Sequence, residues 1–126
     1  MAENKKTILV VEDEQSMANA LMDKIKLLGF KSVWAKDGEE GLMMALENKP
    51  DLILLDLLMP KMNGLDMMTQ LRKDSWGKSV KIIILTNLDA DDKVLEQVVQ
   101  NEPAFYLLKA DWKIDDVMGK IKDIIG

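Results

Sequence analysis

A short apolar segment in the middle of the chain constrains the fold more than any other part of the sequence. Residues 52–55 read Leu-Ile-Leu-Leu, and Asp56 follows them directly. A run without polar alternation predicts a strand that is buried on both faces, which requires a layer of structure on each side. Pro60 and the pair Asn63-Gly64 are turn signals, so the chain leaves the sheet just after Asp56. The strand therefore presents one carboxylate at its end.

Segments of this kind alternate with segments in which apolar residues recur at helical spacing. The expected strands are residues 7–11, 31–35, 52–55, 80–85 and 104–108. The expected helices are about residues 15–28, 38–49, 65–73, 89–99 and 112–125. Their apolar stripes predict the residues that face the sheet. For the second helix these are Leu42, Ala45 and Leu46, and for the fourth they are Val94, Leu95, Val98 and Val99.

Five strands that alternate with five helices predict an α/β fold with a parallel sheet covered on both faces. The crossovers between successive strands are expected to be right-handed. The 126 residues are the length of one domain, and the sequence has no internal repeats or low-complexity segments. In such open sheets ligands bind at the carboxyl ends of the strands.

The residues that are missing from the sequence exclude several kinds of chemistry. The chain has no Cys and no His, so a zinc–thiolate site and a Ser-His-Asp triad are both excluded. The formal net charge of −5 argues against nucleic-acid binding. No apolar run approaches the length of a membrane span, and the first six residues do not resemble a signal segment. A cytoplasmic location is expected.

Four of the five expected strands are followed by a residue that can do chemistry. Glu12 and Asp13 follow the first strand, Asp56 the third, Thr86 the fourth and Lys109 the fifth. Each of these residues could also be there for structural reasons alone, because acids and Thr cap helices and Lys is common on surfaces. Parallel strands place all these ends at one edge of the sheet, and this coincidence favours a functional site.

The charges of these residues indicate the chemistry. Three carboxylates and one ammonium group leave a formal charge of about −2, which a hard divalent cation such as Mg2+ would offset. A carboxylate beside that ion, Asp56, can act as a nucleophile toward phosphorus and form an acyl phosphate. Lys109 and the hydroxyl of Thr86 would then contact the phosphoryl oxygens.

With these residues in place, the chain resembles a response-regulator receiver domain of bacterial two-component systems over about residues 6–125. The run D-x-x-M-P-x-M-x-G begins at Asp56, and the acid pair, the Thr and the Lys stand at the expected spacing. The resemblance implies a flavodoxin-like three-layer (βα)5 sandwich with strand order 2-1-3-4-5. It also implies that Mg2+ is held by Glu12, Asp13, Asp56 and the backbone carbonyl of Leu58.

The resemblance further implies a signalling switch rather than a turnover enzyme. Asp56 would accept a phosphoryl group from a sensor histidine kinase or a phosphotransfer protein. Thr86 and Tyr106 would relay the change to the face formed by the fourth helix, fifth strand and fifth helix. That face would bind a downstream protein, and homodimerisation through it is plausible for the family. Neither nucleic acid nor membrane is expected as a direct partner.

The sequence departs from the family pattern at three places. Glu12 stands where Asp is more frequent, Asn87 where a very small residue is usual, and Ala110 where Pro is usual. A cis peptide before Ala110 would cost roughly 3 kcal/mol, so a trans bond is expected. Leu58 and Leu88 occupy the variable positions beside the phosphorylation site, and we expect them to shield an acyl phosphate from water.

Two other functions remain open at this point. A degenerate receiver would keep the fold and bind proteins without phosphate, and Asn87 and Ala110 leave room for that reading. A phosphatase of the haloacid dehalogenase type needs a second Asp two residues after its nucleophile, where this chain has Leu58. No linker or output domain follows the last helix before Gly126, so a stand-alone regulator and a piece of a longer one are both compatible with the sequence. The sequence names neither a kinase nor a target.

Overall fold

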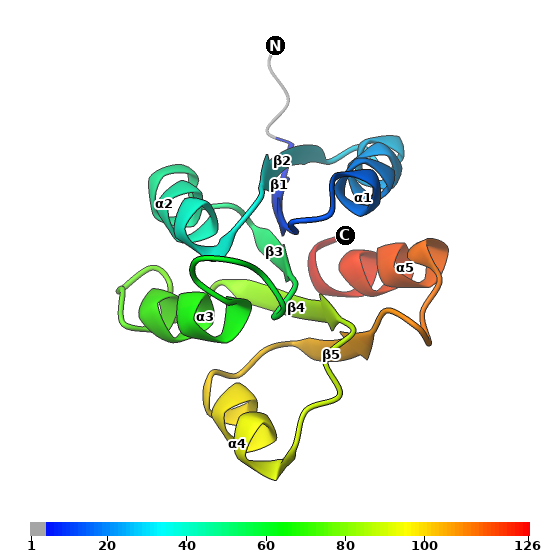
Figure 1. Cartoon of the computed structure of the whole chain (residues 1–126). Helices are drawn as coiled ribbons and strands as arrows, with labels where there is room; N and C mark the ends of the chain where they lie inside the picture. Colours follow the sequence, from blue (N-terminus) through cyan, green and yellow to red (C-terminus); the bar gives the residue numbers. More distant parts are fainter. Residues whose placement is uncertain (1–4) are drawn as a thin grey trace.

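Five parallel strands form a single sheet in the order β2-β1-β3-β4-β5 (Figure 1). The computed structural model describes residues 5–126. The strands are β1 (Thr7–Val11), β2 (Lys31–Ala35), β3 (Leu52–Leu55), β4 (Lys81–Thr86) and β5 (Phe105–Leu108). The helices are α1 (Gln15–Leu27), α2 (Gly38–Asn48), α3 (Gly64–Arg72), α4 (Asp92–Gln100) and α5 (Ile114–Ile125). The predicted flavodoxin-like fold and strand order are confirmed.

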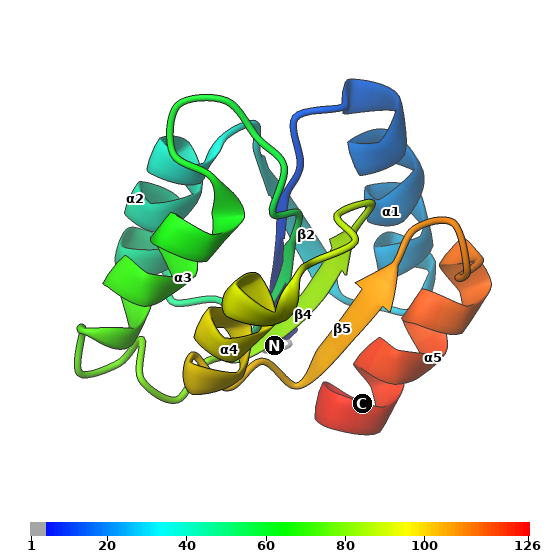
Figure 2. The same ribbon diagram turned by 60° about the horizontal axis from the view of Figure 1, so that its bottom comes forward.

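The helices cover the sheet on both faces, as the unbroken apolar strands require. Figures 1 and 2 show α1 and α5 on one face and α2, α3 and α4 on the other. Alternate residues of the central strand β3 enter different cores: Leu52 and Leu54 pack toward α1 and α5, whereas Ile53 and Leu55 pack toward α2 and α3. The middle of the sheet is thus completely buried.

Local side-chain chemistry sets the ends of several helices. The carboxylate of Asp37 accepts a hydrogen bond from the Glu40 amide at 2.9 Å and caps α2. Asn63 caps α3 in the same way, and Asp91 caps α4. After α1 the chain turns at Gly29, whose φ of 92° lies in the left-handed region that favours glycine. The pair Asn63-Gly64, a predicted turn signal, thus marks the start of α3.

Other boundaries differ from the predictions by one to three residues, and the largest difference is the start of α4, which lies at Asp92 instead of near residue 89. Strand β4 begins at Lys81, the first of its residues to pair with β3, and it includes Thr86. Helix α5 begins at Ile114, two residues later than expected. The peptide bond between Lys109 and Ala110 is trans, and no cis bond occurs within residues 5–126.

The expected inner faces of α2 and α4 are partly wrong. Leu46 of α2 is exposed, while Leu95 and Val99 of α4 are 40% and 68% exposed. Helix α4 lies over the β4–β5 side of the sheet, where only Val98 becomes fully buried (Figure 2). The apolar stripe of α4 is wider than the surface that the sheet offers it. An exposed apolar face results.

The side chain of Arg72 holds the carboxyl-terminal end of α4 to the body of the domain. Its Nε donates to the carbonyl of Asn101 at 2.8 Å, and Nη2 donates to the carbonyl of Glu102 at 3.2 Å. Nη1 donates to the carbonyls of Gly77 and Val80 at 2.7 and 2.8 Å. One guanidinium group therefore joins the end of α3, the following loop, and the turn after α4.

Replacing Arg72 with Met is expected to lower the free energy of unfolding by about 3 kcal/mol, because several backbone carbonyls lose a charged donor. Urea-induced unfolding measures the change. The matched control is Lys73→Met, which removes a charge from the adjacent exposed position and should change the free energy by less than about 0.5 kcal/mol. Equal losses in the two variants would show that the Arg72 contacts do not stabilise the fold.

Candidate functional site

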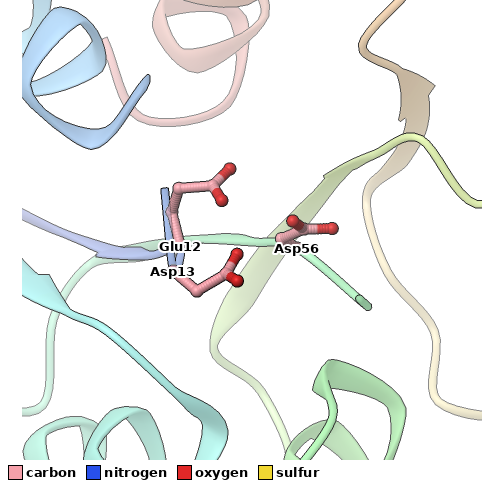
Figure 3. Close-up of side chains that lie close together, drawn as sticks. All are labelled: Glu12, Asp13 and Asp56. Atoms are coloured by element: carbon pink, nitrogen blue, oxygen red, sulfur yellow. The ribbon is translucent and has the colours of Figure 1, made fainter. Parts of the chain in front are cut away.

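The carboxyl ends of four strands bring the candidate residues together at one edge of the sheet. Glu12 and Asp13 directly follow β1, Asp56 directly follows β3, and Lys109 directly follows β5. Thr86 is the last residue of β4. Figure 3 shows the three carboxylates facing a common space. The parallel pairing of the strands, rather than any local motif, produces this cluster.

Asp56 is buried, with 5% of its surface exposed, and its carboxylate accepts three hydrogen bonds. Oδ1 accepts from the hydroxyl of Thr86 at 2.6 Å and from the amide of Leu58 at 3.1 Å. Oδ2 accepts from Nζ of Lys109 at 3.1 Å. These donors fix the orientation of the carboxylate and compensate for the cost of burying it.

Lys109 joins two of the acids. Its Nζ lies 2.5 Å from Oε1 of Glu12 and 3.1 Å from Oδ2 of Asp56. Burial alone would lower the pKa of Lys109, but the hydrogen bond to Glu12 and the charges of Asp56 and Glu12 outweigh it and raise the pKa. Lys109 therefore remains an ammonium group that is directed at Asp56.

Glu12 is almost completely buried and is held by both its side chain and its backbone. Its Oε2 accepts a hydrogen bond from the amide of Glu14 at 3.1 Å. Burial raises the pKa of Glu12, against the lowering effect of its hydrogen bond with Lys109. The indole Nε1 of Trp34 donates to the backbone carbonyl of Glu12 at 2.7 Å. Trp34 thus positions the acid pair, a role that no feature of the sequence indicated.

The acids have the composition and spacing to hold a divalent cation. One carboxylate oxygen from each of Glu12, Asp13 and Asp56 lies within 4.8 Å of the other two. Asp13 is exposed, so an ion could reach this side from solvent. Hard cations such as Mg2+ prefer oxygen ligands, and the formal charge of about −2 remaining after Lys109 would be offset by such an ion. The residues present therefore fit Mg2+.

A chain of hydrogen bonds connects Asp56 with Tyr106. The Thr86 hydroxyl, which donates to Asp56, also accepts from the amide of Leu88 at 3.3 Å. The carbonyl of Leu88 accepts from the hydroxyl of Tyr106 at 2.6 Å. Burial, followed by the nearby charges of Asp89 and Asp56, raises the pKa of Tyr106, so its hydroxyl stays a donor. The backbone of Leu88 joins the site to β5.

Leu58 and Leu88 lie beside this site, and both line an apolar hollow. Leu58 is 49% exposed, and Leu88 is half-buried. Both line a hollow of about 220 Å³ between the loop after β3 and the start of α4, together with Leu57, Met59, Asn63, Leu65 and Val94. Asn87 is exposed. The hollow places apolar surface next to the Asp56 loop.

Comparisons with known proteins find a matching family model and several similar regulators. The family model described as "Response regulator receiver domain" matches residues 8–122. The alkaline phosphatase synthesis transcriptional regulatory protein PhoP of Bacillus subtilis is 43% identical over 93 residues, which are 73% of this chain and 38% of the relative. The probable transcriptional regulator ycf27 of Guillardia theta is 39% identical over 93 residues, which are 73% of this chain and 35% of the relative. The chain thus spans little more than a third of the length of these relatives.

Solved structures share the fold over nearly the whole chain. The Francisella response regulator 1452 receiver domain is 27% identical and superposes with a TM-score of 0.83, covering 95% of this chain and 96% of that one. A CheY-like receiver domain protein from Methanospirillum hungatei superposes with a TM-score of 0.87 at 22% identity, covering 95% and 93%. Within residues 5–126 no helix has the length and apolar character needed to cross a membrane.

Proposed function

This chain belongs to the response regulator receiver domain family of two-component systems, and we propose that it is a signalling switch in which Asp56 accepts a phosphoryl group. The observation that carries the proposal is the environment of the Asp56 carboxylate. Lys109 and Thr86 donate hydrogen bonds to its two oxygens, and two further carboxylates lie within reach of a shared cation.

In the proposed reaction an oxygen of Asp56 attacks phosphorus. A new bond forms between that oxygen and phosphorus, and the bond from phosphorus to the donor breaks, with its electron pair leaving on the donor. Lys109 and Thr86, which now contact Asp56, are within reach of the oxygens of the transferred group and would stabilise their charge. Mg2+, held by Glu12, Asp13, Asp56 and the carbonyl of Leu58, would supply positive charge for the same oxygens.

The hydrogen bonds around Leu88 support a route for the signal. A phosphoryl group on Asp56 would compete for the hydroxyl of Thr86, which also accepts from the amide of Leu88. A shift of this loop moves the carbonyl that Tyr106 binds and the start of α4. We propose that Thr86 and Tyr106 couple phosphorylation to α4 in this way.

The partners in this proposal are a histidine kinase or phosphotransfer protein as donor and a protein as downstream target. The exposed apolar residues Leu95 and Val99 lie on α4 among acidic and amide side chains, which suits a protein-binding surface. The same surface is our candidate for self-association through α4, β5 and α5.

Removal of divalent metal tests the proposal directly. Incubation with acetyl phosphate and Mg2+ should add one phosphoryl group to the intact protein, and the mass spectrum should show no addition when EDTA is present. If the protein gains no phosphoryl group and also fails to bind beryllofluoride, it would instead be a receiver that binds partners without phosphate.

Leu88→Glu is expected to shorten the lifetime of the phosphorylated protein severalfold. Leu88 lines the apolar hollow beside the Asp56 loop, and a carboxylate there would draw water toward the acyl phosphate. The rate of phosphate loss is followed by intact mass after the phosphodonor is removed. Leu95→Glu, an equivalent change on the exposed side of α4, should leave the rate unchanged. A Leu88→Glu variant that loses phosphate no faster than the parent contradicts the shielding role.

A further inference from the structure

A second hollow lies at the opposite edge of the sheet from Asp56, where β1 and β2 begin. It has a volume of about 760 Å³, within the range of small-molecule sites. Its lining comes from the starts of both strands, the end of α1, the turn before β2, and the end of α2. The hollow is open to solvent, and β2 beside it is an edge strand of the sheet.

The register of the strands places basic side chains on both faces of this edge. Thr7 pairs with Lys31, so their side chains point to the face that carries α2. The next residue, Ser32, points to the face that carries α1, where Lys26 and Phe30 also line the hollow. Lys5 also lines the hollow, as does Thr7. The start of β2 is therefore surrounded by three ammonium groups.

The charge of the hollow is opposite to that of the whole chain. Lys5, Lys26 and Lys31 line it, and none of the described residues in its lining is an Asp or Glu. The carboxylate of Asp51 lies nearby but accepts a hydrogen bond from the amide of Thr7, on the β3 side of β1. Within residues 5–126 none of the three lysines forms an ion pair. The lining of the hollow thus carries a formal charge of +3, although the net charge of the chain is −5.

Two further residues of the hollow could contact a ligand through a hydroxyl group and an aromatic ring. The hydroxyl oxygen of Ser32 is the one buried side-chain N or O atom in residues 5–126 that has no hydrogen-bond partner. A buried hydroxyl without a partner is costly, and rotation of the Ser32 side chain toward the hollow would let a ligand oxygen satisfy it. Phe30 is half-buried and supplies an aromatic surface in the same lining. An aromatic ring beside ammonium groups suits a ligand that combines a flat ring with negative charge.

We propose that this hollow is a binding site for a small organic phosphate of nucleotide size. On the face that carries α1, Lys26 and the hydroxyl of Ser32 would contact its phosphate oxygens and Phe30 would pack against the ring, while Lys5 and Lys31 would add positive charge from the other face. Lysine is a frequent ligand of phosphate groups, acting as a compact point charge. The proposal does not depend on phosphorylation of Asp56, because that site lies at the other ends of the strands.

The test uses adenosine diphosphate as the probe, at low ionic strength and in EDTA, so that no metal links the probe to the acids near Asp56. Amide chemical shifts of residues 30–33 should change saturably, and the same titration should give the same Kd in the Asp56→Asn variant. Each of Lys26→Gln and Lys31→Gln is expected to weaken binding about three- to fivefold, as for partly exposed ion pairs. Phe30→Leu should weaken it as well.

The double variant Lys26→Gln/Lys31→Gln has a matched control in Lys73→Gln/Lys93→Gln, which removes the same charge at exposed positions at the end of α3 and in α4. Only the first pair should weaken binding by about tenfold or more. Three results would overturn the proposal: no saturable shift at residues 30–33, equal weakening by both pairs, or inorganic pyrophosphate binding as tightly as adenosine diphosphate. The last result would mean that the hollow attracts anions without recognising the organic part.

Discussion

The Asp56→Asn variant is expected to gain no phosphoryl group from acetyl phosphate and Mg2+, whereas the parent gains one. The amide of Asn lacks the negative charge that makes the carboxylate oxygen a nucleophile. The substitution also removes one of the three charges that would hold the cation, although the side chain keeps nearly the same shape and size. Intact-protein mass after incubation measures the result.

The matched control for this variant is Asp123→Asn, which makes the same chemical change at an exposed position on α5. It should be phosphorylated to the same extent as the parent. Both variants should keep the parent's circular dichroism spectrum, so that a loss of phosphorylation is not confused with a loss of fold. A phosphoryl group on the Asp56→Asn protein would place the acceptor at another residue and refute the proposed role of Asp56.

Gly64→Ala is expected to lower the free energy of unfolding by about 3 kcal/mol, the upper part of the range for overpacking. Gly64 is the first residue of α3, and its amide donates to the carbonyl of Leu57 at 3.1 Å. A Cβ atom at this position would collide with the backbone carbonyl oxygen of Asp56 and lie 2.8 Å from Cα of Leu57. Backbone atoms cannot yield as a flexible side chain can, so the loop after β3 must shift.

Gly119→Ala is expected to stabilise the domain, whereas Gly64→Ala destabilises it. Gly119 lies inside α5, and a Cβ atom there would meet nothing within 4 Å. The substitution should raise the free energy of unfolding by about 0.5–1 kcal/mol, because Ala favours the helix over Gly. Urea-induced unfolding of both variants checks the pair. If Gly64→Ala is as stable as the parent, the loop carrying Asp56 adapts more readily than its close packing implies.

The sequence predicted the fold well because the signals for it are local. The unbroken apolar run at residues 52–55 predicted a fully buried strand. The regular alternation of strands with helices predicted that the sheet is parallel, and it is. The second helix was expected from residue 38, and α2 begins there, capped by Asp37. Parallel strands share one direction, so the positions of Glu12, Asp56 and Lys109 at strand ends were sufficient to place them at one edge. Their assigned chemical roles remain predictions.

The inner faces of two helices were the main errors. Helical periodicity predicted that Leu46, Leu95 and Val99 face the sheet, and all three are exposed. Periodicity identifies the apolar side of a helix but carries no information on how much surface the neighbouring layer offers. For α4, which lies over the edge of the sheet that ends in β5, that surface is narrow (Figure 2).

The order of the elements, the layers and the residues at the strand ends could all be predicted from the sequence. These follow from patterns that repeat within a few residues, from side-chain alternation, helical spacing and turn chemistry. Three contacts could be seen only in the folded domain: Trp34 holds the backbone of Glu12, Tyr106 binds the carbonyl of Leu88, and three lysines line the hollow at the start of β2. Each of these contacts joins residues from different elements, and their distances depend on how the layers pack. No local pattern encodes that packing.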